Sequence, residues 1–195
     1  MVQSMPRTDH SLVSRTILVG SSTLEGTAIS KTLQPSSIAM TKIYEGLGLS
    51  CMYPENWNLT EDTDEERVIG FTLESPTSAF MTVTEYPWTV APREALEQAQ
   101  EVMKSEYDNV EYDEIDPELE LDGKPLADSR ASDSHFYYLD LLVVSRLVAF
   151  TVDRRTYLVQ IQAEDRDFEG LAMVFKAMLV NMLKSINIES RRAKT

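Results

Sequence analysis

The sequence predicts an α+β fold in which a mainly antiparallel sheet of six or seven strands is flanked by helices. Apolar and polar residues alternate along several short runs, which is the pattern of strands with one buried face. Most connections between these runs are short enough for hairpins, which join antiparallel strands. Two longer segments instead show helical spacing. The chain has only seven glycines and no glycine-rich phosphate loop, so nothing favours a parallel nucleotide-binding sheet.

A single domain is expected from residue 40 to residue 188, because a chain of 195 residues with 43% hydrophobic residues can bury one core. Residues 1–39 are rich in Ser and Thr and contain no Phe, Trp or Tyr. This composition predicts a disordered extension, unless Met40 is the true translation start and the segment before it is mis-assigned. Residues 189–195 include Arg191, Arg192 and Lys194, and we expect them to form a solvated basic tail.

The first part of the domain is expected to consist of strands. Three alternating runs lie at residues 47–53, 69–73 and 79–83. The acidic segment at residues 61–66 separates the first two runs, and we expect it to be a hairpin loop.

A helix is predicted over residues 92–107, where the apolar residues Ala95, Leu96, Ala99, Met103 and Tyr107 form one stripe. Pro92 suits the first position of this helix because a proline there loses no intrahelical hydrogen bond.

The second part repeats this order of strands followed by a helix. The acidic run at residues 111–122 ends in Asp122-Gly123, a tight-turn pair, so residues 124–131 are expected to form the return strand. Further strands are predicted over residues 136–144, 146–152 and 156–163. The last helix is predicted to begin near Asp167, a suitable N-cap residue. Its apolar residues at helical spacing are Phe168, Leu171, Phe175, Met178, Met182 and Ile186.

The charge and composition exclude several kinds of partner. A net charge of −14 would repel a nucleic-acid backbone. No apolar run reaches the roughly 18 residues needed to span a bilayer, and no secretion signal is recognisable, so we expect a cytoplasmic location and no membrane span. The single cysteine, Cys51, excludes an intramolecular disulfide, and its position in a strand-like run predicts a buried structural thiol.

No catalytic, cofactor-binding or metal-binding residue is predicted, and we expect a protein that is not an enzyme. The histidines are His10 and His135, and the local set Asp133, Ser134 and His135 is a poor triad because triad members come from separate parts of a fold. The acidic segments lack the turn glycine or the final bidentate glutamate of a calcium loop.

Residues 49–57 (LSCMYPENW) resemble the opening strand and Pro-x-x-Trp turn of the Mog1/PsbP-like superfamily, including its DUF1795 and DcrB-like members. The resemblance continues through residues 83–86 (VTEY), 121–125 (LDGKP) and 146–163, and covers residues 41–188. It implies an α/β/α sandwich around an antiparallel sheet. It also implies a non-enzymatic role, since members bind a small GTPase, assist photosystem II or act as adaptor chaperones for secreted effectors.

Our leading hypothesis is a non-catalytic protein-binding module, adaptor- or chaperone-like, that offers apolar surface to a protein partner or to a second copy of itself. Trp57, Trp88, Met178 and Met182 are the candidate interface residues by type. The alternative for these residues is that they pack in the core or at its rim. The alternative function is a small-molecule or lipid-binding domain with a pocket between sheet and helix. A carboxylate-dependent hydrolase is a third interpretation.

Overall fold

The structure is a computed structural model that describes residues 41–192, apart from residues 66, 88 and 108. Residues 1–39, predicted as an extension, lie outside the described residues. The described elements are β1 (Thr41–Gly46), β2 (Leu49–Pro54), β3 (Asn58–Asp64), β4 (Arg67–Glu74), β5 (Phe80–Tyr86), α1 (Pro92–Glu106), β6 (Glu111–Ile115), β7 (Glu120–Leu121), β8 (Lys124–Pro125), β9 (Ser129–Tyr138), β10 (Leu141–Val152), β11 (Arg155–Glu164) and α2 (Asp165–Arg192).

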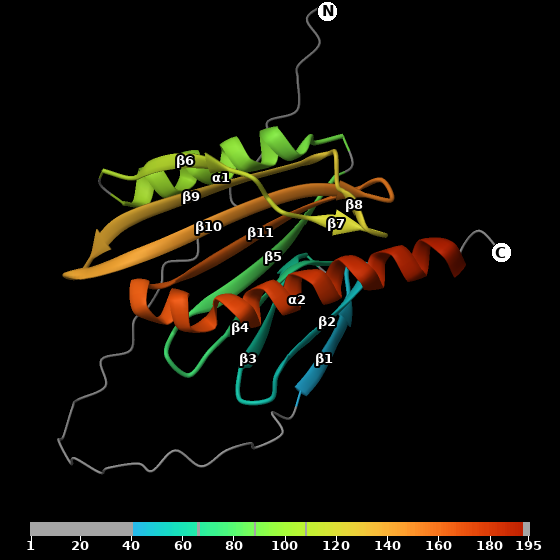
Figure 1. Ribbon diagram of the computed structural model, residues 1–195, viewed down its shortest axis with the longest axis horizontal. Helices are drawn as coiled ribbons and strands as arrows, with labels where there is room; N and C mark the ends of the chain where they lie inside the picture. Colours follow the sequence, from blue (N-terminus) through green and yellow to red (C-terminus); the bar gives the residue numbers. More distant parts are fainter. Residues whose placement is uncertain (1–40, 66, 88, 108, 193–195) are drawn as a thin grey trace, which may run out of the picture. The chain divides into compact units, whose positions relative to one another are not determined.

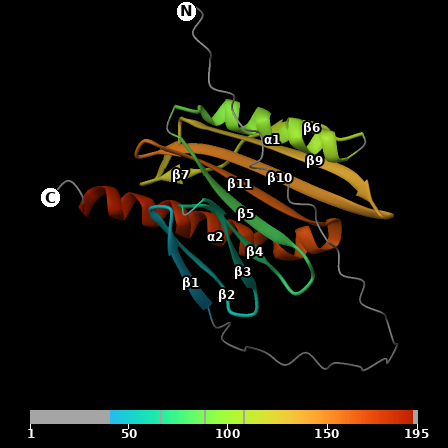
Figure 2. The same ribbon diagram turned by 180° about the vertical axis from the view of Figure 1, so that it is seen from behind.

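A seven-stranded antiparallel sheet with the order β3-β4-β5-β11-β10-β9-β6 forms the centre of the domain. Helix α1 lies on one face of the sheet, and α2 lies on the other face together with the separate β1–β2 hairpin (Figure 1). The view from behind shows the same three layers (Figure 2). The predicted α+β class and the predicted strand number are therefore confirmed.

The main apolar core lies on the α2 side of the sheet. Large side chains from the sheet, the hairpin and the helix are fully buried there, and among them are Leu49, Phe71, Met81, Phe150, Tyr157 and Met182. Burial of such side chains stabilises the fold by about 1.5–3 kcal/mol each. The apolar stripe predicted for the last helix is thus used mainly for this core.

Helix α1 packs through smaller residues over a more polar face. Its buried stripe contains Ala95, Leu96, Ala99 and Met103, as the period of the sequence predicted, whereas Tyr107, the last residue of the predicted stripe, is the C-cap just beyond the helix. The helix contacts mainly β9, β10 and β11, which leaves the outer strands on both sides of it less covered. One of these uncovered margins forms the groove described below.

Side chains of α2 take the place of a neighbouring strand along β2. The backbone N–H of Ser50 donates to Oγ of Ser185 at 2.8 Å, and the N–H of Met52 donates to Oδ1 of Asn181 at 2.9 Å. The spacing fits because residues four apart on a helix are separated by about 6 Å, close to the two-residue repeat of about 6.6 Å on a strand. This edge of the hairpin is thereby closed.

Two hairpin turns fall inside runs that were each predicted to be part of a single strand. Leu47 and Gly48 join β1 to β2, with φ of 52° and 67°, and Leu139 and Asp140 join β9 to β10, with φ of 47° and 66°. Leucine is uncommon in this left-handed region and is not a typical turn residue. The alternation of apolar and polar residues therefore predicted strand at both turns. The break expected before Arg146 was wrong, since β10 is continuous there.

Three further boundaries differ from the prediction. The acidic loop expected over residues 61–66 belongs largely to β3, an edge strand with exposed side chains and hence no apolar alternation. The return strand expected over residues 124–131 is divided between the short β8 and the beginning of β9. Helix α2 begins at Asp165 and continues to Arg192, so the first residues of the expected tail are helical.

Candidate functional site

A groove of about 750 Å³ runs along one side of α1. Its helical wall carries Arg93, Glu97, Gln100 and Lys104, which follow one another at intervals of four, three and four residues. These intervals place the four side chains on one flank of the helix, beside the buried stripe. The groove is called the α1 groove below.

The other wall and the floor of the α1 groove come from β6 and β9. Tyr112 and Glu114 project from β6, and Arg130 and Ser132 project from β9. All four lie on the same face of the sheet, because Glu114 pairs with Ser132 and successive residues of a strand alternate between faces. The groove therefore occupies the margin of the sheet that α1 leaves open.

Polar contacts tie the two walls of the groove together. Gln100 donates a hydrogen bond to the hydroxyl of Ser132 at 3.0 Å, and the ammonium of Lys104 lies 5.7 Å from the ring centroid of Tyr112. Burial raises the pKa of Tyr112 above the usual value for a phenol, and the charge of Glu101 raises it further. A fixed aromatic ring beside a cation is a feature of binding sites as well as of stable folds.

Both signs of charge line the α1 groove. Arg93 forms an ion pair with Glu97 at 2.8 Å, and Glu111, Glu114 and Arg130 also line the groove. Leu96 and Val110 contribute only limited apolar surface. This lining suits a small polar molecule or a polar peptide segment better than an acyl chain.

The sheet face below α1 contains a row of buried polar residues. Ser134, Ser145 and Gln162 are neighbours across β9, β10 and β11, and all three are buried. The hydroxyl of Ser145 donates to the sulfur of Met103 at 3.6 Å. These contacts satisfy the polar groups beneath the helix, so the row stabilises the position of α1.

The tip of the β9–β10 hairpin is the most concentrated apolar exposure among the described residues. Tyr137 is 74% exposed, Leu139 is 70% exposed and Leu141 is 47% exposed. On the neighbouring face, Tyr107 packs on Phe136 with ring centroids 4.4 Å apart, which fixes the base of the hairpin. We call Tyr137, Leu139 and Leu141 the hairpin tip.

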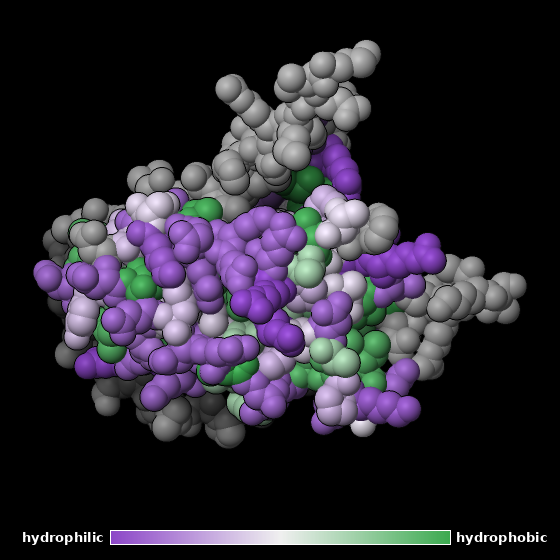
Figure 3. All heavy atoms as spheres, turned by 90° about the horizontal axis from the view of Figure 1, so that it is seen from above, coloured by the Kyte–Doolittle hydropathy of each residue, from purple (hydrophilic) through white to green (hydrophobic). Residues whose placement is uncertain are grey.

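Carboxylates surround the hairpin tip. Asp140 lies in the turn itself, Glu111 is paired with His135 two residues before Tyr137, and Glu164 is paired with Val143 two residues after Leu141. Because Tyr137 is paired with Leu142 and Leu141 with Tyr138, Tyr137 and Leu141 project to opposite faces of the hairpin. The hairpin tip is thus an apolar end of the hairpin with an acidic rim on both faces. The face that carries α1 is mainly hydrophilic, with separated hydrophobic patches (Figure 3).

The interface residues chosen by type lie inside the protein wherever the structure describes them. Trp57 is buried and meets the ring of Phe175 edge-on, with centroids 5.6 Å apart. Met178 and Met182 are buried in the same core, and Trp88 lies outside the described residues. A contact surface therefore has to be built from other side chains. The sequence does not predict the exposed apolar turn at Leu139, because leucine is not a typical residue of a hairpin turn.

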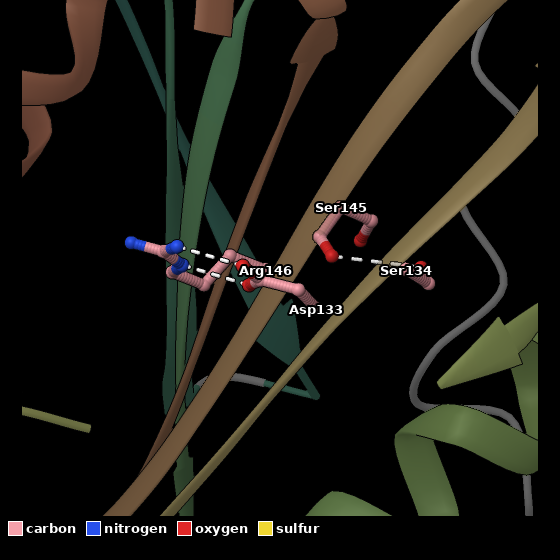
Figure 4. Close-up of polar contacts among 4 residues, drawn as sticks. All are labelled: Asp133, Ser134, Ser145 and Arg146. Atoms are coloured by element: carbon pink, nitrogen blue, oxygen red, sulfur yellow. Dashed lines mark hydrogen bonds and ion pairs between the residues drawn. The ribbon is translucent and has the colours of Figure 1, made fainter. Parts of the chain in front are cut away.

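The local triad considered for Asp133, Ser134 and His135 is not assembled. Ser134 points to the α1 face and donates to the carbonyl of Ser145 at 3.5 Å, whereas Asp133 points to the opposite face and binds Arg146 (Figure 4). Consecutive residues of a strand project to opposite faces, so these three side chains do not act together.

The described residues contain no cluster of three or more histidine, cysteine or acidic side chains arranged to hold a metal ion. Likewise, neither described helix is long and apolar enough to cross a membrane.

The geometry defines an α+β sandwich with a polar groove on one face and an apolar hairpin tip at one end. No family model matches the chain, and no curated protein matches it. Among solved structures, the chain is similar to cyanobacterial PsbP (CyanoP) from Synechocystis sp. PCC 6803, with a TM-score of 0.54 and 9% identity over 77% of this chain and 96% of that one. This likeness shows a PsbP-like fold, as the resemblance in the sequence implied.

Two other solved structures are less similar. LpqN, a protein involved in cell envelope biogenesis of Mycobacterium tuberculosis, gives a TM-score of 0.39 at 12% identity, over 74% of this chain and 83% of that one. A Pseudomonas aeruginosa protein of unknown function, PA94, also gives 0.39, at 11% identity over 73% and 95% of the two chains. Neither value is high enough to support an argument about function.

Proposed function

We propose that the chain is a non-catalytic, adaptor- or chaperone-like protein-binding module that contacts its partner through the hairpin tip. One observation carries the proposal: Leu139 is 70% exposed and also has a left-handed backbone, with φ of 47°. A leucine in this conformation costs about 1–2 kcal/mol compared with a glycine or asparagine. Leu139 therefore destabilises the fold and buries little surface within it. Contact of its side chain with another molecule would explain why a leucine occupies this position.

The rim of the hairpin tip indicates the chemistry of the partner. Asp140, Glu111 and Glu164 would repel an anionic lipid surface, as would the chain's net charge of −14. A protein pocket that is apolar at its centre and basic at its rim complements both the side chains and the charge. The same proposal places the module in the cytoplasm, where a single buried free thiol such as Cys51 is usual.

Cross-linking from defined positions in the native cell tests this proposal. A photoreactive residue at position 139 should give a discrete cross-linked product with one protein, and the product should disappear when Tyr137→Ser is added. Position 173 is the matched control, because Met173 is 76% exposed but lies on α2. It should not give the same product.

The proposal would be wrong if positions 139 and 173 gave the same products, since the contact would then not depend on the hairpin tip. It would also be wrong if the product survived Leu139→Asn in a chain carrying the photoreactive residue at position 141. Asparagine keeps the turn but removes the apolar side chain.

A second candidate function is the binding of a small polar molecule, because the α1 groove lies between helix and sheet, where the alternative hypothesis placed a pocket. Native mass spectrometry of the chain purified from its own cells would reveal a bound molecule. Arg130→Ala should lower its occupancy, whereas Lys184→Ala, an exposed change on α2, should not. A mass equal to that of the bare chain would contradict this candidate.

A further inference from the structure

The free edge of β1 is defined by the hydrogen bonds of its neighbour β2. The backbone groups of Ser50 and Met52 in β2 point toward α2. Because successive residues of a strand point their backbone groups to opposite sides, the N–H and C=O of Cys51 point toward β1. Cys51 is paired with Tyr44 in the register, so the backbone groups of Tyr44 point toward β2. It follows that Ile43 and Glu45 direct their N–H and C=O groups away from the hairpin.

Nothing in the described part of the chain covers this edge. β1 pairs only with β2, and both ribbon views show no described element beyond β1 on its free side (Figures 1 and 2). The side chains of Thr41, Ile43 and Glu45 are all exposed. An isolated two-stranded hairpin is marginally stable, so its edge is open to pairing with a further strand.

The outer face of the hairpin carries an apolar pair next to this edge. Ile43 is 59% exposed and Met52 is 41% exposed, and the two residues are directly opposite each other in the register. An open edge combined with exposed apolar side chains is the arrangement that natural proteins usually avoid. Such an open apolar edge is expected where the strand pairs with another chain.

Charge distinguishes β1 from the two edge strands of the large sheet. β3 contains Glu61, Asp62 and Asp64, and β6 is similarly acidic, so each would repel its counterpart in a second copy. In β1, Lys42 and Glu45 cancel. A second copy of a chain with a net charge of −14 can therefore approach along β1 without strand-to-strand repulsion.

We propose that two copies of the chain dimerise by antiparallel pairing of their β1 strands, centred on Ile43. Opposed residues of antiparallel strands share a face, and only Thr41, Ile43 and Glu45 have outward backbone groups. These two conditions pair Ile43 with the partner's Ile43, and Thr41 with the partner's Glu45. About six backbone hydrogen bonds follow from three such pairs.

This dimer joins the two hairpins into one four-stranded sheet. Its outer face carries a continuous apolar row from Met52 through Ile43 to the partner's Ile43 and the partner's Met52. The row removes from water the side chains that each copy exposes alone, which favours association. The dimer is independent of the hairpin tip, since the tip and β1 belong to different sheets.

Sedimentation of the full chain and two variants tests the proposal. The wild-type chain should sediment as a dimer at about 100 μM, where even weak association is populated. Ile43→Pro should give a monomer, because it removes an N–H that faces outward and leaves the β1–β2 hydrogen bonds intact. Ile43→Lys should also give a monomer, because it places the positive charges of the two lysines opposite each other at the centre of the pairing, where they repel.

Leu139→Ser is the matched control, since it removes an apolar side chain that is at least as exposed as Ile43, but from the hairpin tip, and should leave the dimer unchanged. Circular dichroism and thermal melting of each variant would establish that it is folded. A wild-type chain that sediments as a monomer would overturn the proposal. A dimer that persists in both Ile43 variants would also overturn it, by placing the contact elsewhere.

A disulfide tests the register directly. Ile43→Cys should form a covalent dimer on mild oxidation, because opposed residues of a hydrogen-bonded pair have Cα atoms about 5.5 Å apart, within the range of a disulfide. The natural Cys51 is fully buried and should not compete. Leu139→Cys should stay largely monomeric under the same conditions. Equal cross-linking of the two variants would count against pairing at β1.

Discussion

The carboxylate of Asp133 accepts two hydrogen bonds from the guanidinium of Arg146, from Nε at 2.8 Å and from a terminal nitrogen at 2.7 Å. The two residues are directly opposite each other on β9 and β10. The same guanidinium lies over the ring of Phe168, 5.4 Å from its centroid. The pair therefore joins strands β9 and β10 to the first turn of α2.

Replacing Asp133 by Ala should lower the free energy of unfolding by about 1 kcal/mol, because a bidentate pair is stronger than a single surface ion pair but remains partly solvated. The side chains of Asp133 and Arg146 are 18% and 40% exposed. Arg146→Lys should cause most of the same loss, since lysine keeps the charge but loses the planar fork. Urea unfolding measures both changes, and a lysine variant as stable as wild type would contradict this account.

The contact between Asn181 and the N–H of Met52 gives a second prediction. Asn181→Ala should lower the free energy of unfolding by about 1 kcal/mol, because it leaves a backbone donor of β2 without its acceptor. Asn181→Asp should retain more of the stability, since a carboxylate accepts the same hydrogen bond. Hydrogen exchange of the Met52 amide provides the local measurement. Equal exchange rates in the Ala and Asp variants would show that the side chain does not protect this amide.

Much of the fold was predictable because it depends on periodicity. Helix α1 and the Asp122-Gly123 turn lie where spacing and turn chemistry predicted them. Leu47 and Leu139 were missed because they occupy turns in which leucine is locally unfavourable, and only tertiary packing determines such positions.

The site was less predictable than the fold. The α1 groove joins residues that are distant in sequence, such as Arg93 and Arg130, and depends on how far one helix covers a sheet. No local pattern contains that information. Residue type also misled for Trp57, since a tryptophan suits an interface and a core equally well and only the contact with Phe175 distinguishes them.

Leu139→Asn is expected to make the protein more stable. Asparagine tolerates a left-handed backbone better than leucine, so the change should remove about 1 kcal/mol of strain and raise Tm by about 2–4 °C for a domain of this size. Leu141→Asn is the control, because its backbone lies within β10. It should not raise Tm. If the proposed function is correct, Leu139→Asn should stabilise the fold and weaken partner binding at the same time.

The buried thiol of Cys51 should make stability depend on pH in the alkaline range. Burial raises its pKa from the usual 9.0 to about 12, because the apolar core disfavours the thiolate. The folded state therefore holds this proton more tightly than the unfolded state, so the contribution is complete below pH 9 and is lost as the pH rises toward 12. Urea unfolding at a series of alkaline pH values should show a decline that is shallower in Cys51→Ala, although that variant is less stable at neutral pH. Parallel declines in the two proteins would mean that this thiol does not contribute to the alkaline loss of stability.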